Sequence, residues 1–177
     1  MPTIEEAERN AADLMRYVKI AIIKSCPAAL FEIESHVTDR HMNKSDAFLR
    51  RRVHNIIRRG GQPPERMAST FVADDYFAVA IAVLRELLSN SDTLNLIARY
   101  CISDSYNGAY AIKLSMPPEI SGHGYIYCDG RYQRVECNNI RIVFRCTREF
   151  HILLEQNPPA VTGNNIFLEI VTLYPIR

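Results

Sequence analysis

The stretch GYIYCDGRYQRV, residues Gly124–Val135, decides the fold that we expect for this chain. It contains two short segments rich in aromatic and β-branched residues, and Cys128-Asp129-Gly130 lies between them. Asp-Gly between two such segments is a strong signal for a tight β-hairpin turn. We therefore expect two antiparallel strands, Gly124–Tyr127 and Arg131–Val135.

Similar patterns lie on both sides of the hairpin. Three further segments alternate or run apolar and predict strands: Tyr110–Leu114, Ile140–Cys146 and Ile166–Tyr174. The last strand follows an expected loop, Asn157–Asn164. Both of its faces are apolar, so we expect a central strand that is covered on both sides.

The first half of the chain shows the apolar spacing of helices. Four helices are expected: Glu5 to about Lys24, ended by Pro27; an N-cap at Ser45 to a stop at Gly60-Gly61; Asp74 or Asp75 to about Leu88; and Ser91 to Tyr100. A polar connector containing His36 and His41 separates the first two. Helices followed by strands predict an α+β fold with a mainly antiparallel β-sheet.

Composition narrows the class of protein. The 177 residues are 47% hydrophobic and 23% charged, which fits one globular domain and excludes collagen-like and disordered chains. The longest charge-free apolar run, Tyr76–Leu84, is too short to cross a bilayer, and the acidic start is unlike a secretory signal. The five cysteines include no CxxC pair or complete zinc ligand set, so we expect reduced thiols and no metal or cofactor.

Positive charge is concentrated in one segment. The net charge is only +1, yet Arg40–Arg66 holds eight basic and two acidic residues. This segment is therefore +6, and the remainder of the chain is −5. A local basic stripe can attract a polyanion, because a ligand near contact responds to the local field. A solvated helix face is the alternative interpretation.

The helix after Ser45 separates its arginines by direction. At about 100° per residue, its apolar face is formed by Leu49, Val53, Ile56 and Ile57. Arg51 points away from that face, Arg50 and Arg52 lie on its two borders, and Arg59 is on the flank of Arg52. A border arginine can direct its planar guanidinium along the surface, where it suits phosphate oxygens.

Histidines and a lysine precede this helix. His41 and Lys44 lie just before Ser45, where the N–H groups of a helix start favour an anion. Histidine titrates near neutrality and is the usual general base for a hydroxyl group. For His41 and His36 alike, an ordinary, partly exposed loop histidine is the alternative.

Two hydroxyl groups lie near the end of the last strand. Thr172 and Tyr174 are two residues apart, so their side chains share a face, together with Ile166, Leu168 and Ile170. The hydroxyls are either hydrogen-bonded core groups or part of a site, and the spacing does not choose between these roles.

These segments together resemble a known family. HVTDRHMNKSD (His36–Asp46), followed by Leu49 and Arg52, resembles the opening motif of the bacterial RNase A-like toxin domain, GGHxxxxHVGKS followed by a leucine and an arginine. Ala68–Phe71 (ASTF) is similar to the family's small-Ser-Ser-Phe element, and Val171–Pro175 (VTLYP) to its closing TAYP. Glu34-Ser35 replaces the glycine pair of the motif, and Asn43 replaces the glycine before the lysine.

The resemblance implies a domain over residues 34–177 that is like pancreatic ribonuclease but lacks its disulfides. Residues 1–33 are then an N-terminal helical extension or a linker remnant. The family's catalytic residues fall on His41, Arg52, Thr172 and Tyr174. The expected substrate-binding residues are His36 and Lys44, as neighbours of this site, and Arg59, from its place on the helix.

The implied function is that of an interbacterial toxin from contact-dependent growth inhibition and related systems. Such a toxin cleaves RNA, often tRNA, without a metal, and a larger secreted protein delivers it into the cytoplasm of a target bacterium. A cognate immunity protein normally blocks the site. Two alternatives stay open: a module that binds RNA or another polyanion without cutting it, and an interaction protein that docks a partner through its N-terminal helix.

Overall fold

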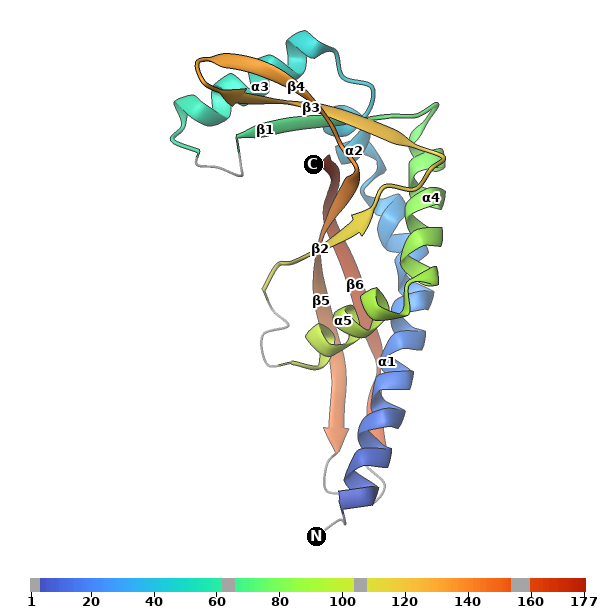
Figure 1. Ribbon diagram of the computed structural model, residues 1–177. Helices are drawn as coiled ribbons and strands as arrows, with labels where there is room; N and C mark the ends of the chain where they lie inside the picture. The colour runs from blue at the N-terminus through green and yellow to red at the C-terminus, as the bar shows by residue number, and fades with distance from the viewer. Residues whose placement is uncertain (1–3, 62–65, 104–107, 154–159) are drawn as a thin grey trace.

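The computed structural model describes residues 4–61, 66–103, 108–153 and 160–177. Its helices are α1 (Ile4–Glu32), α2 (Glu34–His41), α3 (Asp46–Arg58), α4 (Tyr76–Ser89) and α5 (Ser91–Ile102). Its strands are β1 (Met67–Val72), β2 (Tyr110–Ser115), β3 (Ser121–Cys128), β4 (Arg131–Glu136), β5 (Asn139–Leu153) and β6 (Ala160–Ile176). This order confirms the α+β prediction, while β1 is an additional strand within the helical half (Figure 1).

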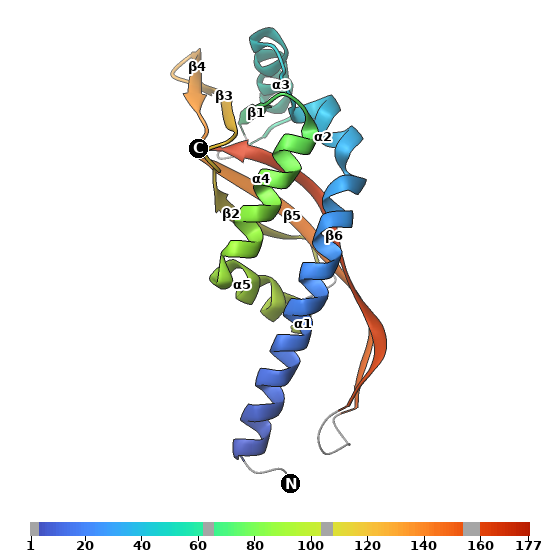
Figure 2. The same ribbon diagram turned by 90° about the vertical axis from the view of Figure 1, so that its right-hand side faces the viewer.

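The strands form two antiparallel sheets of three strands each. The first has the order β1-β3-β4 and the second the order β2-β5-β6. The long β5–β6 ribbon runs along α1, and the first sheet lies across its C-terminal end (Figure 1). α1 and α4 lie next to each other along this ribbon (Figure 2). The C-terminus of β6 is thereby brought to β1 and β3.

The expected helix starts and the hairpin turn are confirmed. The Ser45 side chain accepts a hydrogen bond from the backbone N–H of Phe48 (3.3 Å), and Asp75 caps α4 in the same way. In the β3–β4 turn, Asp129 and Gly130 have φ angles of 51° and 78°. Two positive φ angles in a two-residue loop are those of a type I′ turn, which matches the twist of the paired strands.

The prediction that Pro27 ends the first helix is wrong. α1 continues through Pro27 to Glu32, and α2 occupies the expected polar connector. Proline lacks an N–H group and weakens a helix interior locally. Burial of apolar side chains in the main core offsets this effect, and these side chains come from both sides of the proline: Val18, Ile22, Cys26, Leu30 and Ile33.

The prediction that the last strand is central is also wrong, because β6 lies at the edge of its sheet and β5 at the centre. β6 begins at Ala160, so the expected loop Asn157–Asn164 is wrong from residue 160 onward, and residues 157–159 lie outside the described residues. β6 also contains a β-bulge. Thr172 pairs with Val143 and Ile170 pairs with Phe144, which leaves Val171 as an extra residue.

The bulge changes the face on which the two hydroxyls lie. Leu168, Ile170 and Leu173 are buried on the core side, opposite Cys146, Phe144 and Ile142. Thr172 and Tyr174 therefore project from the other side of the sheet, not from the face of Leu168 and Ile170 as the unbroken alternation predicted. They still share a face with each other. β-Bulges commonly redirect side chains next to functional sites.

All five cysteines lie within the described residues, and no two of them are at disulfide-bonding distance.

A smaller core lies between α3 and the first sheet, made by Leu49, Val53, Ala68 and Tyr125. In the described part of the chain, none of the helices is long and apolar enough to span a membrane.

Candidate active site

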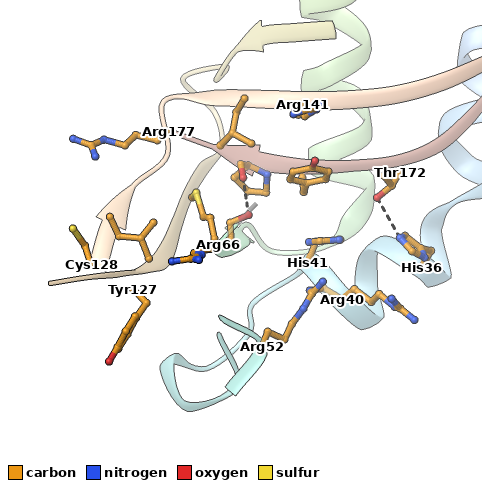
Figure 3. A pocket seen from close by; sticks show the side chains of 16 residues that line it. His36, Arg40, His41, Arg52, Arg66, Tyr127, Cys128, Arg141, Thr172 and Arg177 are labelled. Carbon is orange, nitrogen blue, oxygen red and sulfur yellow. Dashed lines mark hydrogen bonds between the residues drawn. The ribbon is translucent and has the colours of Figure 1, made fainter. Parts of the chain in front are cut away.

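A cleft of about 780 Å³ opens where α2, α3 and β1 meet the ends of β3 and β6 (Figure 3). Five arginines line it: Arg40, Arg52, Arg66, Arg141 and Arg177. His36, His41, Thr172 and Tyr174 line it as well. None of the described residues that line the cleft is acidic. A concave surface with this charge favours an anionic ligand.

β1 fixes the two halves of the site. The Thr70 hydroxyl donates to the carbonyl of His41 (3.2 Å) and accepts from the backbone N–H of Lys44 (2.9 Å), which holds the segment after α2. The neighbouring Ser69 hydroxyl donates to the carbonyl of Pro175 (2.6 Å), which holds the end of β6. Ser69 and Thr70 therefore attach two segments that are distant in the sequence to one strand.

The turn between His41 and α3 depends on Asn43. Its φ of 47° is in the left-handed region, which asparagine tolerates better than most residues. Its N–H donates to the Phe71 carbonyl (2.9 Å) and its amide group donates to the Ala73 carbonyl (2.7 Å). Asn43 thus supplies the left-handed backbone that this turn requires.

His41 is a buried imidazole with a strongly altered pKa. The residue is 7% exposed, and its ring stacks on Tyr174 with 5.5 Å between centroids. Burial, and next the charge of Arg52, lower its pKa from 6.5 to about 4, against an opposing interaction with the Ser69 backbone. Its Nδ1 has no hydrogen-bond partner among the described residues. His41 is therefore neutral at physiological pH, the state in which an imidazole can accept a proton, although the lowered pKa makes it a weaker base than a free histidine.

Arg52 lies beside this imidazole. Its Nη1 donates to the carbonyl of Arg40 (2.7 Å), which ties α3 to the end of α2. Burial and the charge of Arg40 lower its pKa, but a guanidinium remains a cation at any physiological pH. Helix geometry placed both Arg50 and Arg52 on the borders of the apolar face, and Arg52 is the one that lines the cleft. Arg50, on the opposite border, instead contacts the ring and hydroxyl of Tyr125.

The hydroxyls of β6 complete the group. Nε2 of His36 is 3.2 Å from Oγ1 of Thr172, and the His36 ring is 6.0 Å from the His41 ring. Figure 3 shows His36, His41 and Arg52 on one wall and the end of β6 on the other. The structure therefore brings together the four predicted catalytic residues and one predicted substrate-binding residue: His41, Arg52, Thr172, Tyr174 and His36.

Lys44 and Arg59 are not among the residues that line the cleft. The ammonium group of Lys44 lies over the ring of Phe48 instead, 5.6 Å from its centroid. Arg59 is the C-cap of α3, at the far end of the helix from the Ser45 cap. The position of these two residues gives no support to a substrate-binding role.

Sequence reasoning missed several arginines of the cleft. Arg141 pairs with Tyr174 across β5 and β6, and side chains of a cross-strand pair lie on the same face. Only the register between the two strands reveals this neighbour. Arg40 and Arg66 belong to the basic segment, but no helical spacing relates them to Arg52. No sequence pattern pointed to Arg177 as a residue of the cleft.

Comparisons of the chain with protein-family models, with curated proteins and with solved structures give no match. Within the described residues, no group of three or more His, Cys, Asp and Glu side chains is placed to hold a metal ion.

Proposed function

We propose that this chain is an endoribonuclease that cleaves RNA through attack of the ribose 2′-hydroxyl, and that it is a toxin domain of the RNase A-like family. The observation that carries the proposal is the position of His41, a neutral imidazole stacked on Tyr174 beside Arg52, in a cleft lined by positive charge. An enzyme that cleaves a phosphodiester in this way needs a group that accepts a proton and, next to it, a cation that binds the phosphate.

In the proposed reaction, His41 accepts the proton of the 2′-hydroxyl. The 2′-oxygen then attacks the adjacent phosphorus, and the bond to the 5′-oxygen breaks. Arg52 stabilises the charge that develops on the phosphorane oxygens, because its guanidinium can give two parallel hydrogen bonds. Thr172 and Tyr174 supply hydroxyl groups on the opposite wall, which bind phosphate oxygens or give the leaving 5′-oxygen its proton.

This reaction has a defined product. It leaves a 2′,3′-cyclic phosphate on one fragment and a 5′-hydroxyl on the other, and DNA is spared because it lacks the 2′-hydroxyl. The proposal uses no metal or cofactor. In line with the resemblance, we propose tRNA as the RNA, the cytoplasm of a target bacterium as the place of action, and a cognate immunity protein as the partner that blocks the cleft.

The test is end-group analysis after incubation of the protein with total tRNA in EDTA. Wild-type protein should give fragments with 2′,3′-cyclic phosphate ends, and His41→Ala should abolish them. His54→Ala is the matched control, since His54 is exposed on α3 and does not line the cleft. Far-UV circular dichroism of both variants checks the fold.

Two outcomes would overturn the proposal. Full cleavage by His41→Ala would remove His41 from the mechanism. Intact tRNA that nevertheless shows a salt-dependent band shift would favour a module that binds RNA without cutting it. Growth arrest on expression in bacteria, relieved by His41→Ala but not by His54→Ala, tests the toxin part separately.

A further inference from the structure

The cleft extends beyond the proposed reaction centre. Figure 3 shows Arg66, Cys128 and Arg177 on one side of His41, and His36 and Arg40 on the other. The reaction described above uses neither Arg66 nor Arg177. Positive charge therefore continues past the atoms that would react, in the direction of the β3–β4 hairpin.

Arg66 has a defined position at this end. Its Nε donates to the carbonyl of Gly61 (2.7 Å), and the guanidinium is left with further N–H groups for a ligand. It immediately precedes β1, and Ser69 comes three residues later in the same extended segment. At the usual rise of about 3.3 Å per residue, Arg66 lies roughly 10 Å along the strand direction from the point where Ser69 holds Pro175.

Apolar side chains also line the cleft. Met67 and Ile126 face each other across the β1–β3 pair and both line the cleft. On the other wall, Arg177 follows Pro175 and Ile176 at the end of β6 and is exposed. A cleft lined by both apolar side chains and guanidinium groups suits a chain that alternates flat bases with phosphates.

We propose that this end of the cleft, formed by Arg66, Met67, Ile126 and Arg177, binds the nucleotides that flank the scissile bond of a single-stranded RNA. Arg66 and Arg177 contact backbone phosphates, and an unstacked base lies on Met67 and Ile126. That the bound strand is also cut next to this end rests on the proposed function. The binding of a single strand at this end does not. The protein should accordingly prefer oligonucleotides to a dinucleotide.

The first arm of the test measures cleavage. Arg66→Gln combined with Arg177→Gln should lower the initial rate on a dilute single-stranded octaribonucleotide about tenfold, as expected for the loss of two exposed ion pairs. The rate on a diribonucleotide should fall less, because that substrate feels the charge of these arginines but does not reach their end of the cleft. Arg51→Gln is the matched control, since Arg51 is an exposed arginine of α3 that does not line the cleft.

The second arm measures binding without cleavage. Fluorescence anisotropy of an all-deoxy octanucleotide, titrated at several salt concentrations, gives the slope of log K against log salt. Each lost phosphate contact should reduce that slope by about 0.7, and Arg51→Gln should leave it unchanged. If thermal melting shows that Arg66→Gln impairs folding, the salt slope is measured with Arg177→Gln alone, because Arg177 is exposed.

The two arms separate the two proposals. Equal rate losses on both substrates, or an unchanged salt slope, would overturn the flanking site even if wild-type protein cuts RNA. A reduced slope in a protein that cuts neither substrate would support the flanking site and overturn the nuclease.

Discussion

The burial of His41 makes a quantitative prediction about acid stability. Its pKa is about 4 in the folded protein and about 6.5 in the unfolded chain. Between these values the unfolded chain holds a proton that the folded protein does not, so acidification favours unfolding. This loss of folding free energy is absent above pH 6.5, grows as the pH falls, and is complete below pH 4. At pH 5 it amounts to about 2 kcal/mol, at 1.36 kcal/mol for each pKa unit.

The assay is urea denaturation at pH 7.5 and pH 5 of wild type, His41→Gln and His54→Gln. Glutamine cannot titrate, so the free energy of unfolding of wild type should fall by about 2 kcal/mol more than that of His41→Gln between the two conditions. The effect of the titrating carboxyl groups is the same in both proteins and cancels in this comparison. The control His54→Gln, at an exposed position of α3, should lose as much stability as wild type does. An equal fall for wild type and His41→Gln would refute the conclusion that a neutral, desolvated imidazole lies beside Tyr174.

Three other predictions concern the same cleft. Ser69→Ala removes the 2.6 Å hydrogen bond to the buried carbonyl of Pro175. The variant should lose about 1 kcal/mol, which lowers the melting temperature by roughly 2–4 °C, and RNA cleavage should decrease; an unchanged melting curve would contradict this bond. Arg52→Lys keeps the charge but loses the planar guanidinium, which also donates to the Arg40 carbonyl. Initial-rate assays should show at least about a tenfold loss of cleavage for Arg52→Lys and no loss for the control Arg51→Lys. If His41 is the proton acceptor as proposed, the kcat/KM for RNA should stay level down to about pH 5 and decrease as the pH approaches 4. A decrease centred near pH 6.5 would indicate an unperturbed histidine instead.

Local patterns predicted the parts of the fold that local physics determines. The N-cap at Ser45 and a helix start at Asp74 or Asp75 were predictable because the side-chain oxygen of such a residue accepts a hydrogen bond from a free N–H of the first turn. Asp129-Gly130 forms the hairpin turn because few residue pairs accept two positive φ angles. The helical repeat placed Arg50 and Arg52 on the two borders of the apolar face, but it did not tell which of them lines the cleft.

Features that depend on distant contacts were not predictable in this way. α1 continues through Pro27 because side chains on both sides of the proline reach one core. The extra Val171 becomes visible only once β6 is paired with β5, and Arg141 becomes a neighbour of Tyr174 only through that register. The meeting of His41 with Tyr174 was anticipated from the family resemblance, because no local pattern relates residues so far apart in the sequence.

The central claim is that the residues gathered from α2, α3 and β6 act on a ribose 2′-hydroxyl. It is tested most directly with a single-stranded DNA oligonucleotide that contains one ribonucleotide. We expect one cut, on the 3′ side of that ribonucleotide, which leaves a 2′,3′-cyclic phosphate detectable by mass spectrometry. The strand should stay intact when the same position carries a 2′-O-methyl group. Cleavage at deoxynucleotides or at the 2′-O-methyl position, or no cleavage of the ribonucleotide-containing strand, would contradict it.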